Sequence, residues 1–540
     1  MLVEVLLIFL VFFVVGGDPP PHENEAHYLC RLKHHWNPDW CAGDLFLVSA
    51  DAQLAFVWAF GWLTRWLSLT AVAWLGRIVA WSLLAWAWQR LSSRLVPRPW
   101  FAVLTAALFI TVNEQAHLAG EWIVGGVEGK CFAYAFVVFA LRELLDDRWG
   151  RVWLLLGAAM AFHPLVGGWS ALVCGEIWLL AGLNGFRIAN FKLQVAKLTS
   201  DLPRMWSGIV GGALLALIGV VPALALTWGE SADVVSEAAR IYVFERLRHH
   251  LALLALPIDE VLNRVFRHAA LLIAMAALAH QLWKKSPHDA GMRRIVQFAT
   301  GAALLAAIGF VIEMMLWSEP LVAARLLRYY WFRLTDFAAP LAVALLAAAL
   351  ISIGIRERRT SAVWGLTVAI AVTSWNLAHR AAERIPGLTP PADSRLRDVA
   401  AWEDVCHWIA ANTEPDALFL TPRTSQTFKW HAGRAEVVTR KDIPQDARSI
   451  VEWFSRYRDI HFTDERQGEL LDPVLSISHL GTERVLQLAD KYGFDYVVTD
   501  WRRPLWLPVV YPNVAHANHE YVVYRITKRS DASRNDADGR

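Results

Sequence analysis

The sequence predicts an α-helical, polytopic membrane protein with a small C-terminal α/β domain. The 540-residue chain is 56% hydrophobic and contains 28 Trp, a content typical of proteins with aromatic belts at both membrane surfaces. Long apolar runs recur through the first 385 residues, and basic residues gather in every second connection between them. After Pro386 the hydropathy falls, and shorter helix and strand patterns replace these runs.

Eleven apolar runs are candidate transmembrane helices, because an α-helix needs about 20 apolar residues to cross a bilayer. A break at His163-Pro164 and Gly167-Gly168 predicts a tight hairpin between two of them. The first run carries Glu4 in place of a basic segment and has no small-residue cleavage site, which favours an uncleaved helix over a signal peptide. The runs lie near residues 2–16, 69–89, 99–112, 130–145, 152–166, 169–185, 207–226, 266–283, 295–316, 334–354 and 361–379.

The distribution of Lys and Arg predicts the orientation of these helices. Alternate connections (90–98, 142–151, 186–204, 284–294 and 355–359) hold 17 Lys and Arg in 54 residues, whereas the opposite connections hold 10 in about 130 residues. Because basic loops stay in the cytoplasm, we expect an inner-membrane protein with a cytoplasmic N-terminus. The predicted transmembrane domain is 1–385, with exoplasmic loops 17–68, 113–129, 228–265 and 318–333.

The remainder of the chain predicts an exoplasmic α/β domain over residues 386–528, followed by a disordered polar tail at 529–540. Helical and buried-strand patterns alternate there, as in small α/β domains. The domain has no Gly-rich nucleotide loop, zinc-ligand spacing or nucleophile elbow. The expected elements are helices at 394–411 and 481–492 and strands at 416–421, 494–500 and 520–526.

The first predicted outer loop carries acidic residues close to the membrane. Glu23, Glu25 and Asp44 lie within it, together with Asp39. A carboxylate at this level can act as a general base or bind a metal. The alternative is a solvated loop without catalytic function. Cys30 and Cys41 share this loop, where a disulfide is compatible with an oxidising compartment, although spacing alone does not decide whether it forms.

The second outer loop, 113–129, contains Glu114, Glu121 and Glu128. Glu114 and Glu121 are seven residues apart, so they share one face if the segment is helical. These acids are candidates for a metal or acceptor site. The alternative is that they are surface charges with partners elsewhere in the chain.

A third group lies in the loop 318–333, where Arg325, Arg328 and Arg333 oppose the positive-inside pattern. Arginines at the outer membrane surface either extend to lipid headgroups or hold a phosphate through paired hydrogen bonds. Both interpretations remain open from the sequence.

Together these features resemble the GT-C glycosyltransferase superfamily. The chain shares a short first span, an outer loop with acids before Tyr28, many irregular spans and a C-terminal exoplasmic domain. A closer likeness is to an uncharacterised group of bacterial membrane proteins that share two elements. These are W-I-x-x-N-T-x-x-D-A-L-F-L-T-P, from Trp408 to Pro422, and F-x-W-x-A-G-R-x-E-V-V-x-x-K-D-I-P, from Phe428 to Pro444.

The resemblance implies sugar transfer from a polyprenyl-phosphate carrier to a glycan, lipid or protein acceptor. It assigns the base on the acceptor to Glu25, with Glu23 and Asp44 as substitutes, and contacts with the lipid phosphate to Arg325, Arg328 and Arg333. The superfamily often has Asp-Glu or Asp-x-Asp where this chain has Glu-Asn-Glu. The motif therefore leaves open whether the reaction uses a divalent metal. The alternative function is a non-catalytic GT-C-like scaffold or a transporter in envelope polysaccharide assembly. No nucleic-acid partner is expected.

Overall fold

A computed structural model describes residues 1–185, 191–384, 389–462, 465–466, 469–470 and 476–527. The chain divides into two compact units. The first comprises residues 1–17, 52–56 and 75–388, and the second comprises 18–51, 57–74 and 389–540. The predicted tail at 529–540 lies outside the described residues.

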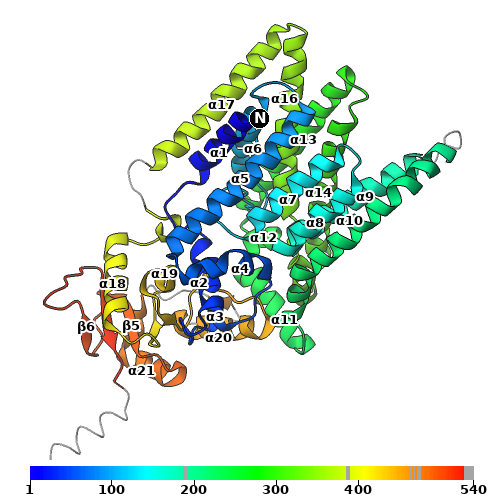
Figure 1. Ribbon diagram of the computed structural model, residues 1–540. Coiled ribbons are helices and arrows are strands. Elements are labelled where there is room, and N and C mark those ends of the chain that lie inside the picture. Colours follow the sequence, from blue (N-terminus) through cyan, green and yellow to red (C-terminus); the bar gives the residue numbers. More distant parts are fainter. Residues whose placement is uncertain (186–190, 385–388, 463–464, 467–468, 471–475, 528–540) are drawn as a thin grey trace, which may run out of the picture. The chain divides into compact units, whose positions relative to one another are not determined.

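The first unit is a bundle of long helices (Figure 1), and every predicted apolar run coincides with a helix. Among the described residues, seven helices are long and apolar enough to cross a membrane: α5, α9, α10, α13, α14, α16 and α17. The other four runs form shorter helices of 14 to 16 residues, so the number of crossings stays a prediction. The helices are α1 (Leu2–Gly16), α5 (Leu69–Leu95), α6 (Phe101–Ala116), α7 (Gly129–Leu144), α8 (Trp149–Phe162), α9 (Pro164–Gly185), α10 (Phe191–Ala225), α13 (Ile258–Lys285), α14 (Ala290–Met315), α16 (Arg333–Arg356) and α17 (Thr360–Arg384).

Glycines let three of these helices pack with their backbones in contact. A Cβ on Gly208 of α10 would lie 2.0 Å from the carbonyl oxygen of Gly150 on α8, and one on Gly212 would lie 2.3 Å from that of Trp153. Gly208 and Gly212 stand four residues apart, the spacing that brings membrane helices close together. The break between α8 and α9 is shorter than predicted, because only His163 separates them. Gly167 belongs to α9, where it lets the helix approach Met160.

Short helices connect the long ones in two of the predicted outer loops. They form a small apolar cluster in which Val243, Leu251, Ala324 and Leu327 are fully buried. The elements are α11 (Ala232–Arg240), the π-helical turn η3 (Ile241–Arg246), α12 (Arg248–Leu251), η4 (Leu253–Ala255) and α15 (Pro320–Leu327).

The second unit is built on a mixed five-stranded sheet of order β2-β1-β5-β7-β6. Strands β2, β1 and β5 are parallel, while β7 runs antiparallel to β5 and β6. Trp402 and Ile409 of α18 (Val399–Asn412) pack with Phe419, Val498 and Val523 of the sheet in one apolar core. The strands are β1 (Leu418–Leu420), β2 (Ala435–Glu436), β5 (Tyr496–Asp500), β6 (Val509–Tyr511) and β7 (Tyr521–Arg525), and β3 (Glu465–Arg466) pairs separately with β4 (Glu469–Leu470).

The small C-terminal sheet confirms the α/β pattern expected there. The predicted helix at 481–492 is α21 (Gly481–Tyr492), and the predicted helix at 394–411 begins later, as α18 (Val399–Asn412). The sequence did not predict α19 (Phe428–Ala432), α20 (Ala447–His461), β2 or β6.

The second unit also contains residues 18–51, which form α2 (Glu25–Trp36) and α3 (Leu45–Val48). These helices contact α19 and α20, respectively. The other short elements of the chain are α4 (Leu54–Phe60), η1 (Gly61–Arg65), η5 (Pro391–Asp393) and η6 (Ile477–Leu480). The first predicted outer loop is therefore largely folded together with the C-terminal segment.

Candidate functional site

The acidic residues of the first loop occupy different environments. Glu25 is the first residue of α2 and is fully buried, and its Oε2 accepts a hydrogen bond from the backbone N–H of His22 at 2.8 Å. Glu23 is half-buried, and it makes no hydrogen bond or ion pair with any residue that the structure describes. Of this pair, Glu23 is the carboxylate that a solute can reach.

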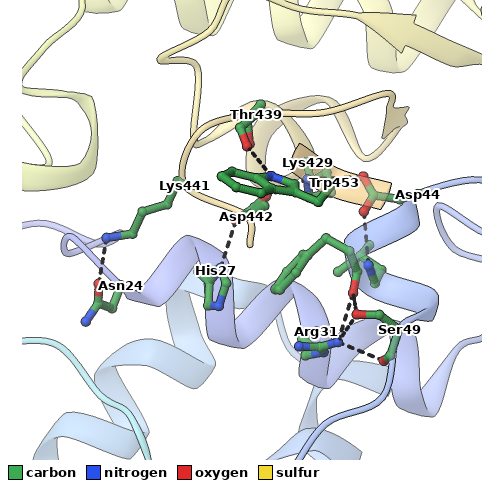
Figure 2. A network of polar contacts seen from close by, with 12 residues as sticks. Asn24, His27, Arg31, Asp44, Ser49, Lys429, Thr439, Lys441, Asp442 and Trp453 are labelled. Atoms are coloured by element: carbon green, nitrogen blue, oxygen red, sulfur yellow. Dashed lines mark hydrogen bonds and ion pairs between the residues drawn. The ribbon is translucent and has the colours of Figure 1, made fainter. Parts of the chain in front are cut away.

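Asp44 belongs to a buried charged cluster centred on Lys429 (Figure 2). The Lys429 ammonium lies 3.1 Å from Asp44, 2.5 Å from Glu436 and 2.6 Å from Asp442. Lys429 contacts Oδ2 of Asp442, and the other carboxylate oxygen, Oδ1, lies 2.9 Å from Nδ1 of His27 on α2. All five side chains are at least nine-tenths buried.

The cluster is also supported by backbone contacts. The Asp44 carboxylate accepts from the N–H of Leu47, which caps α3, and from the N–H of Glu436 on β2. Nearby, the ammonium of Lys441 donates to the side chain of Asn24 at 2.7 Å. Because every polar group of Asp44 and Lys429 is engaged, their arrangement suits the joining of segments better than proton transfer to a substrate.

The electrostatics of the cluster divide its carboxyl groups into two kinds. Burial alone would raise the pKa of Asp442, but Lys429 and His27 outweigh it and hold that pKa well below the ordinary value. Burial raises the pKa of Glu436 to about 7, because Lys429 only partly offsets the loss of water. The pKa of Lys429 is well above its usual value, since three carboxylates outweigh its burial. The ammonium therefore stays charged at all physiological pH values.

A second charged cluster lies in the first unit, where the second loop meets the helices. Arg333, at the start of α16, lies 3.0 Å from the Glu121 carboxylate. Lys130 of α7 lies 3.6 Å from Glu121 and 3.0 Å from Glu128, with its ammonium 3.8 Å from the ring centroid of Trp122. Both glutamates and Lys130 are buried. The two carboxylates face two cations, Lys130 and Arg333, so the charges of the cluster balance.

Arg333 has further partners that fix its position. Its Nη1 lies 3.0 Å from Nε2 of His163, and its guanidinium lies 3.9 Å from the ring centroid of Tyr330. Tyr134 donates to Glu121 at 3.2 Å. Arg333 is thus held within the protein in this structure, unlike the other two arginines of its group.

Asp336 holds the second loop in place. Its carboxylate accepts hydrogen bonds from the backbone N–H groups of Leu118, Ala119 and Glu121 at 2.5, 2.9 and 3.2 Å. Glu114 lies elsewhere, in contact with Asn376 and Arg380 of α17 at 2.8 and 3.0 Å. The structure therefore separates Glu114 from Glu121, and each is paired with a cation.

Arg325 and Arg328 lie in and directly after α15. Arg325 is exposed and makes no hydrogen bond or ion pair with another described residue. Arg328 lies 5.9 Å from the ring centroid of Tyr329 and likewise has no carboxylate partner in the described part of the chain. These two guanidinium groups remain available to an anion.

Glu23 and Glu25 belong to the second unit, whereas Arg325 and Arg328 belong to the first. Lys429 and Asp336 are central to their clusters and were not singled out in the sequence. Asp336 lies more than 200 residues from its partners, and Lys429 lies 385 residues from Asp44, so local spacing does not connect these groups. Cys30 and Cys41 are both buried free thiols. Among the described residues, one group has the spacing to hold a metal ion, namely Asp393, Glu403 and His431.

Comparison with known proteins gives a family match only for part of the second unit. A family described as a domain of unknown function, DUF6798, matches residues 400–460, from α18 to α20. A search of curated proteins gives no match.

Two solved structures of the Archaeoglobus fulgidus oligosaccharyltransferase are similar to most of the chain. The complex with Zn and sulfate is 14% identical, with a TM-score of 0.49, and the match covers 92% of this chain and 67% of that one. The enzyme tethered through a disulfide bond to an acceptor peptide containing the NVT sequon is 13% identical, with a TM-score of 0.44 and coverage of 92% and 69%.

Proposed function

We propose that this protein is a GT-C-like membrane glycosyltransferase that transfers a sugar from a polyprenyl-phosphate carrier to an acceptor outside the cytoplasm. The observation that carries the proposal is the pair of arginines at the end of α15, Arg325 within the helix and Arg328 directly after it. The resemblance of the sequence to GT-C enzymes supplies the reaction class. The proposed location is a bacterial inner membrane, with the second unit on the exoplasmic side.

The surface of α15 suits a ligand that is both apolar and anionic. Its buried face consists of Ala323, Ala324 and Leu327, and its exposed face includes Leu321, Val322 and Leu326, each at least 40% exposed. An exposed apolar face next to an arginine is typical of a membrane interface. A polyprenyl chain would contact the apolar side chains, and guanidinium groups would bind its phosphate through paired hydrogen bonds.

The proposed reaction is an inverting transfer. A carboxylate of the first loop removes the proton from an acceptor hydroxyl as its oxygen attacks the sugar carbon, and the bond from that carbon to the phosphate oxygen breaks. The arginines stabilise the negative charge that develops on the departing phosphate. Glu23 is the accessible carboxylate, whereas Glu25 would require movement of the start of α2 to reach a substrate.

The phosphate contact is tested by replacing Arg325 and Arg328 with Gln in the purified full chain. Binding of a short-chain polyprenyl phosphate in nanodiscs should weaken about tenfold or more, since each hydrogen bond to a charged group contributes about 1.5–3 kcal/mol. Arg248→Gln is the matched control, because Arg248 is an exposed arginine of the same predicted membrane side. If the double variant, Arg248→Gln and the unaltered chain bind the polyprenyl phosphate equally, the two arginines simply contact lipid headgroups.

The base is tested by comparing Glu23→Gln with Glu25→Gln. The variant that removes the base should insert into the membrane normally and lose label transfer from a polyprenyl-phosphate-linked hexose to membrane acceptors. Full transfer by both variants would reject a first-loop carboxylate as the base.

One observation favours the alternative of a transporter. Glu176 is exposed and lies inside the candidate span Pro164–Ala181, and ionisable groups within spans often mark ion pathways. Glu176→Gln should leave sugar transfer unchanged if the protein is a transferase. A transporter would give a different result. Neither the unaltered chain nor Glu176→Gln would transfer sugar, and Glu176→Gln would lose proton-coupled export of an envelope precursor.

A further inference from the structure

Three side chains from separate segments of the second unit meet at one point. Asp393 ends the short helix η5, Glu403 lies in α18, and His431 lies in α19. One ligand atom from each lies within 4.8 Å of the other two. Asp393 is buried, whereas Glu403 and His431 are half-buried, so the group borders on solvent.

Asp393 is oriented by a second layer of hydrogen bonds. The Thr427 hydroxyl donates to its Oδ1 at 2.5 Å. The same hydroxyl accepts from the indole N–H of Trp402 at 3.0 Å, which fixes the direction in which it donates. Such outer contacts are typical of carboxylates that bind metals, because they hold one oxygen in place and leave the other free to coordinate.

The distance between Asp393 and His431 is informative. Oδ2 of Asp393 lies 3.4 Å from Nε2 of His431, which is long for an N–H···O hydrogen bond of about 2.9–3.0 Å. Two ligands that each lie about 2.0–2.1 Å from a tetrahedral Zn²⁺ are separated by about 3.3 Å. The pair is therefore spaced as two ligands of one ion would be.

Glu403 is available as a third ligand. It makes no hydrogen bond or ion pair with the rest of the described chain. His407 follows it by four residues on the same face of α18, and its ring centroid lies 6.3 Å from that of His431. His407 is exposed, so it is free to turn toward the group as a fourth ligand.

We propose that Asp393, Glu403 and His431 form a binding site for a divalent transition metal of the Zn²⁺ class. Imidazole nitrogen together with carboxylate oxygen favours Zn²⁺ over Ca²⁺ or Mg²⁺, which prefer oxygen ligands alone. The metal joins η5, α18 and α19, so it stabilises the N-terminal edge of the C-terminal segment. The site is independent of the proposed sugar transfer.

The test uses the purified full chain, freed of metal with a chelator and then titrated with Zn²⁺ or Co²⁺. Glu403→Gln and His431→Gln should each remove one equivalent of bound metal, or weaken its binding at least tenfold. They should also abolish the rise in the thermal midpoint that Zn²⁺ causes. His519→Gln is the matched control, because His519 is an exposed histidine of the same unit with no hydrogen bond or ion pair to another described residue.

Glu403→Gln separates metal binding from folding, because the Glu403 side chain has no hydrogen-bond or ion-pair partner in the described chain whose loss would destabilise the metal-free protein. Its thermal midpoint without metal should equal that of the unaltered chain. Visible Co²⁺ absorption typical of a tetrahedral site, absent from Glu403→Gln, supports the proposal. Equal stoichiometry and affinity in Glu403→Gln, His431→Gln and His519→Gln would overturn it.

Discussion

Lys429 illustrates how much one buried cation can determine. Its ammonium contacts the carboxylates of Asp44, Glu436 and Asp442 at 3.1 Å or less, in a place without access to water. Bringing these charges out of water is costly, and their mutual attraction offsets that cost only while all partners are present. Removal of the cation leaves at least two carboxylates buried and uncompensated.

Lys429→Met should therefore destabilise the second unit by about 3–5 kcal/mol. Limited proteolysis of the purified full chain, followed across a temperature series, measures the change. Lys491→Met is the control, because Lys491 pairs with Asp459 at the surface and exposed pairs contribute about 0–1 kcal/mol. Equal protease resistance in the two variants would contradict a central role for Lys429.

Glu436 predicts an unusual pH dependence for the same cluster. Its pKa is raised to about 7, so the folded state holds this proton more tightly than the unfolded chain does. The contribution of Glu436 to stability is therefore fully present below about pH 4.5 and is lost as pH rises toward 7. The lowered pKa of Asp442 acts oppositely, since its contribution is lost only in stronger acid.

The prediction is that Glu436→Gln reduces the loss of stability between pH 5.5 and pH 7.5. The amide cannot ionise, so the variant lacks the proton release that destabilises the unaltered chain. Thermal midpoints at the two pH values, measured on both proteins in one buffer system, give the difference. Burial also lowers the pKa of His27, and this residue is present in both proteins, so their difference reports mainly the ionisation of Glu436.

At this scale the sequence indicated part of the site and missed the rest. Asp44 could be singled out because it lies in an acidic loop next to an apolar run. Lys429 could not, because Asp44 is 385 residues away (429 minus 44). Glu436 and Asp442 are only 7 and 13 residues away, but no local pattern marks a buried lysine. The three-residue metal group was missed because Asp393, Glu403 and His431 are spread over 38 residues without a recognisable ligand spacing.

Among the elements, the membrane helices were predictable and the connecting segments were not. An apolar run long enough for a bilayer predicts a helix directly, because lipid offers the backbone no other hydrogen-bond partners. The positions of α15 and of the loop 117–128 depend on contacts with distant helices. The close contact of α8 and α10 is visible in the sequence as glycines on both helices, among them Gly150 and Gly157 on α8 and Gly208 and Gly212 on α10.

Asp336 provides a test of how one element holds another. Asp336→Ala would leave the backbone N–H groups of Leu118, Ala119 and Glu121 without an acceptor, at about 1–3 kcal/mol for each buried donor. Hydrogen exchange of peptides spanning 117–128 should rise at least tenfold, with little change in α10. Unchanged protection of this segment would show that other contacts suffice to hold the loop. Asp289→Ala is the control, because Asp289 caps α14 in a different connection.

At the scale of the whole molecule, seven helices of the described chain are long and apolar enough to cross a membrane, and a small sheet lies in the second unit. Its orientation rests on the distribution of Lys and Arg. If the basic connections are cytoplasmic, alkaline phosphatase fused after residue 530 should be active, because that enzyme folds only outside the cytoplasm. Fusions after residue 148 and residue 288 should be inactive. If instead the fusions after residues 148 and 288 are active and the fusion after residue 530 is not, the topology is the reverse of the one proposed. The second unit would then lie in the cytoplasm.

The joining of residues 18–51 with the C-terminal segment has a consequence for biosynthesis. Asp44 leaves the ribosome 385 residues before Lys429, from positions 44 and 429. At about 5–20 residues per second, the first loop waits roughly 20–80 s for its cation. During that interval its apolar and acidic side chains lack their final neighbours, while the bundle helices are inserted one after another. The second unit is therefore completed last, and a nascent chain that stalls before residue 429 would present an unfinished loop to chaperones and proteases.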